Sequence, residues 1–303
     1  MRKIVMKAFG KINLTLDVSG KRDDGFHELE TLFRGIHLYD IVSLERRDRG
    51  IQLECDDEAL PMGPENLAYE AAAVLMEDFP QVTGVNIQLV KRIPVAAGLA
   101  GGSTDAAAVL VGMNRLFGLD LTKVQMEDYA ARIGSDVPFC LYPLSAVGRG
   151  RGERLTEAPE GPAMWIVLVK PPFGLSTGEI YEHLEQVAID ARPNLEEVLL
   201  GMETKDLERI YRNMGNVLEY SAFDLQPRLR DWERDLSVLR ADRVMMTGSG
   251  PTLVAYFSDE EGARRLAAQW TQPRWDVLLS RTLSKAEVED RMIFYEKTEN
   301  EEE

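Results

Sequence analysis

Small residues gather in one stretch of the chain, residues 94–104, which reads Pro-Val-Ala-Ala-Gly-Leu-Ala-Gly-Gly-Ser-Thr. Glycine tolerates positive φ angles, and small side chains let several backbone N–H groups approach one ligand. A helix is predicted over residues 105–117, and its first N–H groups would face back toward this loop. The combination is typical of a phosphate-binding loop. The alternative is that the small residues only allow a helix and a strand to pack closely.

Ser103 and Thr104 end this loop, where they could cap the helix and offer hydroxyl groups to a phosphate or to Mg²⁺. The loop is not a Walker A motif, because each Gly-Lys pair of the chain is followed by Ile or Arg rather than by Ser or Thr. It is not a dinucleotide-binding fingerprint either, since Asp120 follows a helix and does not end a second strand.

Lys11, Asn13 and Asp136 are further candidates for chemistry. Ile12, Leu14, Leu16 and Val18 alternate with polar residues, so a strand is predicted that directs Lys11 and Asn13 to one face. Asp136 follows a helix-ending glycine and precedes Val-Pro, which is the pattern of a helix N-cap. A carboxylate there could cap, act as a base, or do both, and Lys11 could simply be solvated.

The elements that must position these residues are strands and helices without regular alternation, which predicts an α+β fold. Strands are predicted over residues 85–90, 164–169, 243–247 and 253–257, and helices over 105–117 and 122–133. The stretch Glu157–Pro162 is rich in Pro and Gly and predicts a boundary between two lobes, residues 1–160 and 161–290. We expect the acidic tail, residues 291–303, to be disordered.

Composition and charge narrow the class of protein. The 303 residues carry 35 Lys and Arg against 51 Asp and Glu, and the net charge of −16 disfavours nucleic acid and anionic membranes as partners. No apolar run is long enough to cross a bilayer, and the N-terminus lacks the pattern of a signal peptide. Two cysteines without a Cys-x-x-Cys motif predict neither a disulfide framework nor a zinc site. We therefore expect a cytoplasmic protein that acts on a small molecule, as a monomer or a dimer.

The stretch 94–108 resembles the ATP-binding motif of the GHMP kinases (galactokinase, homoserine kinase, mevalonate kinase, phosphomevalonate kinase). The resemblance extends over nearly the full length of the chain. It includes Lys11-Ile12-Asn13, Asp24-Gly25-Phe26-His27, Gly134-Ser135-Asp136, Gly150-Arg151-Gly152-Glu153, Ser176-Thr177-Gly178-Glu179, Gly215-Asn216-Val217-Leu218-Glu219 and Thr247-Gly248-Ser249-Gly250-Pro251. The blocks Asp24-Gly25-Phe26-His27 and Lys11-Ile12-Asn13 together narrow the resemblance to one branch of the family. The kinases of this branch phosphorylate a cytidyl-diphosphate ester of methylerythritol in non-mevalonate isoprenoid synthesis.

This resemblance implies a two-lobed fold, with an N-terminal lobe like domain 2 of ribosomal protein S5 and a ferredoxin-like C-terminal lobe. It also implies ATP and Mg²⁺ as cofactors and catalytic roles for Lys11 and Asp136. The ATP-binding residues would be Pro94, Val95, Ala96, Ala97, Gly98, Leu99, Ala100, Gly101, Gly102, Ser103 and Thr104, and Ser103 is the candidate metal ligand. The residues that bind the acceptor would be Asn13, Phe26, His27, Thr177, Tyr181, Gly248 and Ser249.

The sequence departs from the family pattern at several positions. Phe26 replaces the usual Tyr, which keeps a stacking surface and removes a hydroxyl group. Phe9-Gly10 and Pro143-Leu144 could reshape the walls of the cleft. Taken alone, residues 24–27 form a turn, Tyr181 is a core residue and residues 248–250 form a hairpin turn. A GHMP kinase for another small alcohol, such as mevalonate, and a non-catalytic nucleotide-binding protein remain as alternatives.

Overall fold

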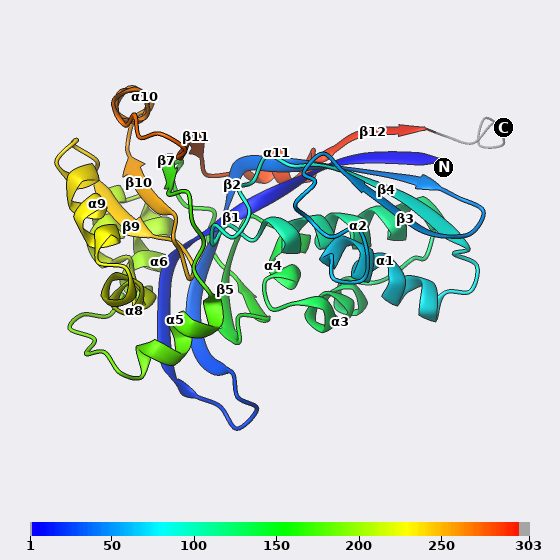
Figure 1. Cartoon of the computed structure of the whole chain (residues 1–303), viewed down its shortest axis with the longest axis horizontal. Coiled ribbons are helices and arrows are strands. Elements are labelled where there is room, and N and C mark those ends of the chain that lie inside the picture. Colours follow the sequence, from blue (N-terminus) through cyan, green and yellow to red (C-terminus); the bar gives the residue numbers. More distant parts are fainter. Residues whose placement is uncertain (1, 297–303) are drawn as a thin grey trace.

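Two long antiparallel strands, β1 (Lys3–Lys21) and β2 (His27–Arg46), form a hairpin that belongs to both halves of the molecule. In Figure 1, which shows the computed structural model, this blue hairpin crosses from the first lobe to the junction with the second. The structure describes residues 2–296. Burial alternates along the start of β1, as a strand with one covered face requires, but residues 8–16 are buried on both faces because the strand passes between the lobes.

The first sheet has the strand order β12-β1-β2-β4-β3, and β5, β6 and β8 are attached through β2, β5 and β1. Helices α1 to α4 lie on one side of it (Figure 1). The bounds are β3 Gly50–Cys55, β4 Gly84–Val90, β5 Ser145–Gly150, β6 Arg154–Glu157, β8 Gly215–Asn216, β12 Met292–Glu296, α1 Leu67–Asp78, α2 Gly101–Phe117, α3 Lys123–Ile133 and α4 Val137–Leu141.

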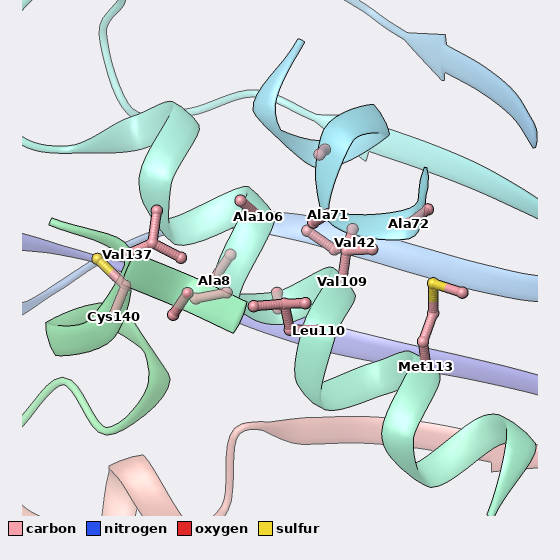
Figure 2. Close-up of a cluster of buried hydrophobic side chains, with 14 of the residues drawn as sticks. Ala8, Val42, Ala71, Ala72, Ala106, Val109, Leu110, Met113, Val137 and Cys140 are labelled. Atoms are coloured by element: carbon pink, nitrogen blue, oxygen red, sulfur yellow. The ribbon is translucent and has the colours of Figure 1, made fainter. Parts of the chain in front are cut away.

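Helix α2 is the centre of the first lobe's core. Its buried residues Ala106, Val109, Leu110 and Met113 face β1, β2, α1 and α4, as Figure 2 shows. The helix lies close to β2: a Cβ atom at Gly112 would come within 2.4 Å of the Leu44 side chain. This packing fixes the start of α2, and with it the glycine-rich loop, relative to the long hairpin.

The second lobe contains a four-stranded antiparallel sheet in the order β11-β7-β10-β9. Helices connect β7 to β9, and α10 connects β10 to β11. Numbered within the lobe, the strand order is 4-1-3-2, and the predicted ferredoxin-like arrangement is confirmed. The bounds are β7 Trp165–Lys170, β9 Arg243–Met246, β10 Leu253–Phe257, β11 Asp276–Arg281, α5 Thr177–Leu184, α6 Leu195–Thr204, α7 Leu207–Asn213, α8 Leu218–Leu225, α9 Arg228–Ser237, α10 Glu260–Gln269 and α11 Lys285–Glu289.

The C-terminal segment differs from the prediction. After β11 the chain returns to the first lobe, where the N–H of Leu283 donates to the carbonyl of Gly35 at 2.9 Å. Strand β12 then pairs antiparallel with β1 over Lys3–Met6. The prediction of a disordered tail from residue 291 is therefore wrong for Met292–Glu296, whose backbone forms the edge strand of the sheet. Residues 297–303 lie outside the described part.

The expected boundary between the lobes, Glu157–Pro162, begins at the last residue of β6 and continues into the coil that leads to β7. Among residues 2–296, no helix has the length and apolar character needed to span a membrane.

Candidate active site

A cavity of about 830 Å³ lies where the two lobes meet. Its walls come from separate parts of the chain, among them strand β1, the tip of the β1–β2 hairpin, the loops before α1, α2 and α4, the start of α5 and the loop after β9. A volume near the upper end of the range for ligand pockets suits two bound molecules, or one long one, rather than a single small metabolite.

The glycine-rich loop forms one wall of this cavity. Ala96, Gly98 and Ala100 have φ angles of 50°, 73° and 60°, so the backbone turns through the left-handed region at every second residue. A Cβ atom at Gly98 would lie 2.3 Å from the carbonyl oxygen of Thr247, so only glycine fits there. Helix α2 begins directly after this loop, at Gly101, and the first N–H groups of a helix lack intrahelical acceptors. The loop and the helix start together form a site for an anion.

Two expectations about this loop need correction. Ser103 and Thr104 do not cap α2, because the helix already begins at Gly101, and its N-cap residue Ala100 makes no side-chain capping bond. Thr104 is buried and its hydroxyl donates to the carbonyl of Phe9 at 2.5 Å, so it ties α2 to β1 and does not face the cavity. Leu99 is buried as well, and its carbonyl accepts from the Lys11 N–H. Ser103 lines the cavity with the rest of the loop.

Lys11, Asn13 and Asp136 meet at the inner end of the cavity. The Lys11 ammonium lies 3.3 Å from Asp136 Oδ2 and donates to Asn13 Oδ1 at 3.0 Å. The Lys11 side chain is 4% exposed and that of Asp136 is 32% exposed, so the cation is enclosed while the carboxylate remains open to the cavity. Asp136 makes no side-chain bond to the start of α4, although it is that helix's N-cap residue. Its carboxylate is thus available for chemistry rather than used for capping.

A second glycine-rich loop, residues 247–250, approaches this pair from the other lobe. A Cβ atom at Gly248 would lie 3.0 Å from the carbonyl oxygen of Gly98 and 3.5 Å from the Lys11 ammonium. The Thr247 hydroxyl accepts from the Asn13 N–H at 3.1 Å. The two loops therefore contact each other beside Lys11, and each lobe contributes one of them.

Aromatic residues line the far end of the cavity. The rings of His27 and Tyr181 are 5.1 Å apart and tilted by 33°. Phe26, at the tip of the hairpin, is 49% exposed, and the guanidinium of Arg151 lies 4.6 Å from the centre of its ring. His27 Nε2 is buried and makes no hydrogen bond within the described residues, although a carboxylate oxygen of Glu185 lies 3.4 Å away. Burial raises the pKa of Tyr181 above its ordinary value, so the ring is neutral.

Thr177 and Ser249 connect two parts of the second lobe that line the cavity. Their hydroxyl groups lie 2.9 Å apart, and Thr177 is the first residue of α5. All seven residues predicted to bind the acceptor line the cavity.

The sequence interpretation missed the part of the wall that includes Leu60, Pro61, Asn66, Leu67 and Lys91. Asn66 accepts from the Ala68 N–H at the start of α1 and donates to the Pro61 carbonyl, which fixes this wall. No pattern in these residues distinguishes them from an ordinary loop and helix cap. Arg151 also lines the cavity and belongs to the motif Gly150-Arg151-Gly152-Glu153, so it could have been proposed as a cation that binds a phosphate.

Lys91 is held in a buried cluster with Asp40 and Asp105. Burial raises the pKa of Asp105 to about 7, with Asp40 acting in the same direction and Lys91 opposing it. The cluster joins β2 and the residue after β4 to the second turn of α2, and so stabilises the position of the loop.

Within residues 2–296, no three His, Cys, Asp or Glu side chains come together as a metal site would require. Mg²⁺ needs no such cluster, since it keeps several waters and uses one or two protein oxygens together with substrate phosphates. Ser103 supplies an oxygen atom of that kind to the cavity, so the site fits a magnesium–nucleotide complex.

The fold and the site define a class of protein. Residues 66–143 match the family model of the GHMP kinases N terminal domain, and residues 191–273 match the GHMP kinases C terminal model. A homoserine kinase from Cytophaga hutchinsonii, 18% identical, shares the fold with a TM-score of 0.73 over 93% of this chain and 95% of that chain. The chain belongs to the GHMP kinase family.

More similar relatives narrow this assignment. A 4-diphosphocytidyl-2-C-methyl-D-erythritol kinase of Moorella thermoacetica is 44% identical over 93% of this chain and all of the relative. That of Syntrophomonas wolfei is 42% identical over 92% of this chain and 98% of the relative. A crystal structure of 4-(cytidine 5'-diphospho)-2C-methyl-D-erythritol kinase, 32% identical, matches with a TM-score of 0.79 over 93% of this chain and all of that one. Within the GHMP kinases, the chain belongs with these enzymes.

Proposed function

We propose that the protein transfers the γ-phosphoryl group of ATP to the 2-hydroxyl of 4-diphosphocytidyl-2-C-methyl-D-erythritol, a step of non-mevalonate isoprenoid precursor synthesis. The relatives support the choice of acceptor through their names. The observation that carries the proposal is the Lys11–Asp136 pair, which lines the same cavity as the glycine-rich loop and a group of aromatic side chains.

Phosphoryl transfer depends mainly on positioning and on charge stabilisation. The loop of residues 94–103 and the start of α2 bind the triphosphate. Asp136 takes the proton of the acceptor hydroxyl as that oxygen bonds to the γ-phosphorus, and ADP leaves. Lys11 neutralises charge on the transferring group. Its burial strengthens this effect, because little water screens the ammonium.

Magnesium would be held by the phosphates together with the Ser103 hydroxyl. When bound, the ion supplies charge neutralisation for the β- and γ-phosphate oxygens.

The aromatic end of the cavity binds the cytosine. Phe26 and Tyr181 offer ring faces for stacking, and His27 offers ring nitrogens to the base edge. Phe26 lacks the hydroxyl of the usual Tyr, but its ring already lies against the Arg151 guanidinium. Arg151 adds a cation near the acceptor's diphosphate, which a protein of net charge −16 needs locally.

The middle of the cavity binds the rest of the acceptor. Asn13 and Thr177 bond the erythritol and diphosphate, and Gly248 and Ser249 bring backbone N–H groups to the phosphates. Asn13 is held in place by Lys11 and by the Thr31 hydroxyl, to which its amide donates at 2.7 Å.

An assay of ATP consumption with a panel of alcohols tests the proposal. The cytidyl acceptor should give by far the highest kcat/KM, and the product should carry its new phosphate on the 2-hydroxyl, as ³¹P NMR can establish. A higher kcat/KM for mevalonate would favour another GHMP activity. Binding of ATP without turnover of any alcohol would instead favour a nucleotide-binding protein without catalysis.

A further inference from the structure

The motif Gly215–Glu219 has no part in the mechanism above, and its side chains do not line the cavity. Asn216 is nevertheless 3% exposed and completely hydrogen-bonded. Its amide nitrogen donates to the carbonyls of Met246 and Gly248, at 2.9 and 2.8 Å, and its amide oxygen accepts from the Leu218 N–H at 3.0 Å. Both hydrogen bonds that the Asn216 amide nitrogen donates therefore go to the end of β9 and the loop that follows it.

Glu219 supports the same loop from the next turn of the chain. Its carboxylate accepts from the Met246 N–H at 2.6 Å. The N–H and the C=O of Met246 are thus both held by the motif, which fixes the point where the loop leaves β9.

The geometry of the peptide bond gives the Asn216 contact a consequence for the cavity. The bond between Gly248 and Ser249 is trans, and in a trans peptide the C=O and N–H groups point in opposite directions. Because the Gly248 carbonyl points at Asn216, the Ser249 N–H points away from it. Ser249 lines the cavity, and its N–H makes no hydrogen bond to any other described residue.

If the Gly248–Ser249 peptide had the opposite orientation, the Gly248 carbonyl oxygen would point toward the cavity in place of the Ser249 N–H. Gly248 has a φ of 57° and no side chain to resist such a flip, so an external contact must select the orientation. The Asn216 amide is that contact. The Thr177 hydroxyl, at the start of α5, lies 2.9 Å from the Ser249 hydroxyl, so a further donor group lies beside Ser249.

We infer that Asn216 is a positioning residue that orients the Gly248–Ser249 peptide, so that the Ser249 N–H binds the diphosphate of the acceptor. This inference rests on the proposed function, which supplies the diphosphate. Asn216 touches no substrate and acts only through the loop.

The variant Asn216→Asp tests the inference. Aspartate has the shape of asparagine and keeps the acceptor for the Leu218 N–H, but it presents a carboxylate oxygen to two carbonyl oxygens. In the presence of a non-hydrolysable ATP analogue, the Kd for CDP should rise about tenfold or more, the usual scale for one hydrogen bond to a charged group. The Kd for cytidine, which has no phosphate, should not change, and KM for ATP should not change either.

Asn194→Asp is the matched control, because Asn194 caps α6 through its amide oxygen, is exposed and does not line the cavity. This variant should bind CDP as the wild type does. An unchanged Kd for CDP in Asn216→Asp would overturn the inference, and so would an equal loss of CDP and cytidine binding, which indicates general damage to the site.

A measurement on the wild-type protein covers the case in which Asn216→Asp does not fold. In protein labelled with ¹⁵N-serine, the amide signal of Ser249 is identified by its absence in Ser249→Ala. CDP should shift this signal and cytidine should not, whereas a signal unmoved by CDP would overturn the inference. Failure of the proposed function would look different: the wild type would not turn over the cytidyl acceptor at all.

Discussion

Asp136→Asn is the most informative substitution at the site. The amide has the shape of the carboxylate, and it keeps an oxygen for the Lys11 ammonium, which lies 3.3 Å from Asp136 Oδ2. Lys11 also keeps its bond to Asn13, so the buried cation is not left without a partner. What the variant loses is the ability to accept the hydroxyl proton.

The expected effect is a fall in kcat of about 100-fold or more, the usual scale for loss of a general base. This corresponds to at least ~2.7 kcal/mol of transition-state stabilisation. The Kd for ATP should stay near the wild-type value, because the nucleotide is bound by the loop before α2. The melting temperature should also stay near that of the wild type, since Asp136 makes no side-chain capping bond.

Steady-state kinetics with a coupled ADP assay, together with calorimetric titration of ATP, measures both quantities. Asp259→Asn is the matched control: Asp259 caps α10 through the Gly262 N–H, outside the cavity, and Asn caps as well as Asp. A kcat within twofold of the wild type in Asp136→Asn would refute the assignment of the base.

Three further changes probe the rest of the account. His27→Ala should raise KM for the cytidyl acceptor about tenfold with little change in kcat, because it removes a donor to the base and the ring against Tyr181; an unchanged KM would break the cytosine assignment. Gly98→Ala should weaken ATP binding and lower the melting temperature, since its Cβ would lie 2.3 Å from the Thr247 carbonyl oxygen; normal ATP titration would contradict the close contact of the loops. Burial raises the pKa of Glu219 to about 8. The folded state therefore binds the Glu219 proton more tightly than the unfolded state does. The contribution of this group to the free energy of unfolding is fully present below pH 4.5 and is lost as the pH rises toward 8. Unfolding titrations of Glu219→Gln should show a flatter dependence over that range, and identical curves would argue against the raised pKa.

Local sequence patterns predicted many of the helices and strands. The strand at Leu253–Phe257 has its predicted bounds, and Thr122 and Gln125 form the predicted capping box. The helix predicted at Asp105 begins four residues earlier, at Gly101, because Ala100 adopts the left-handed conformation that ends the loop. A single sequence gives no sign that an alanine will do so.

The site could be predicted only where residues close in sequence share a face. Strand alternation placed Lys11 and Asn13 together, and they hydrogen-bond. The buried Asp40–Lys91–Asp105 cluster could not be anticipated, because charged residues so far apart in sequence meet only through the packing of α2 on the sheet. Strand β12 was missed because the acidic residues after it dominate the composition of the C-terminus.

A crystal structure with a non-hydrolysable ATP analogue and the cytidyl acceptor tests the central claim most directly. The account predicts the triphosphate against residues 94–103, the cytosine beside His27, and the acceptor's 2-hydroxyl about 2.6–3.2 Å from the Asp136 carboxylate, in line with the γ-phosphorus. A 2-hydroxyl that lies beyond reach of Asp136, with another side chain beside it, would contradict the account.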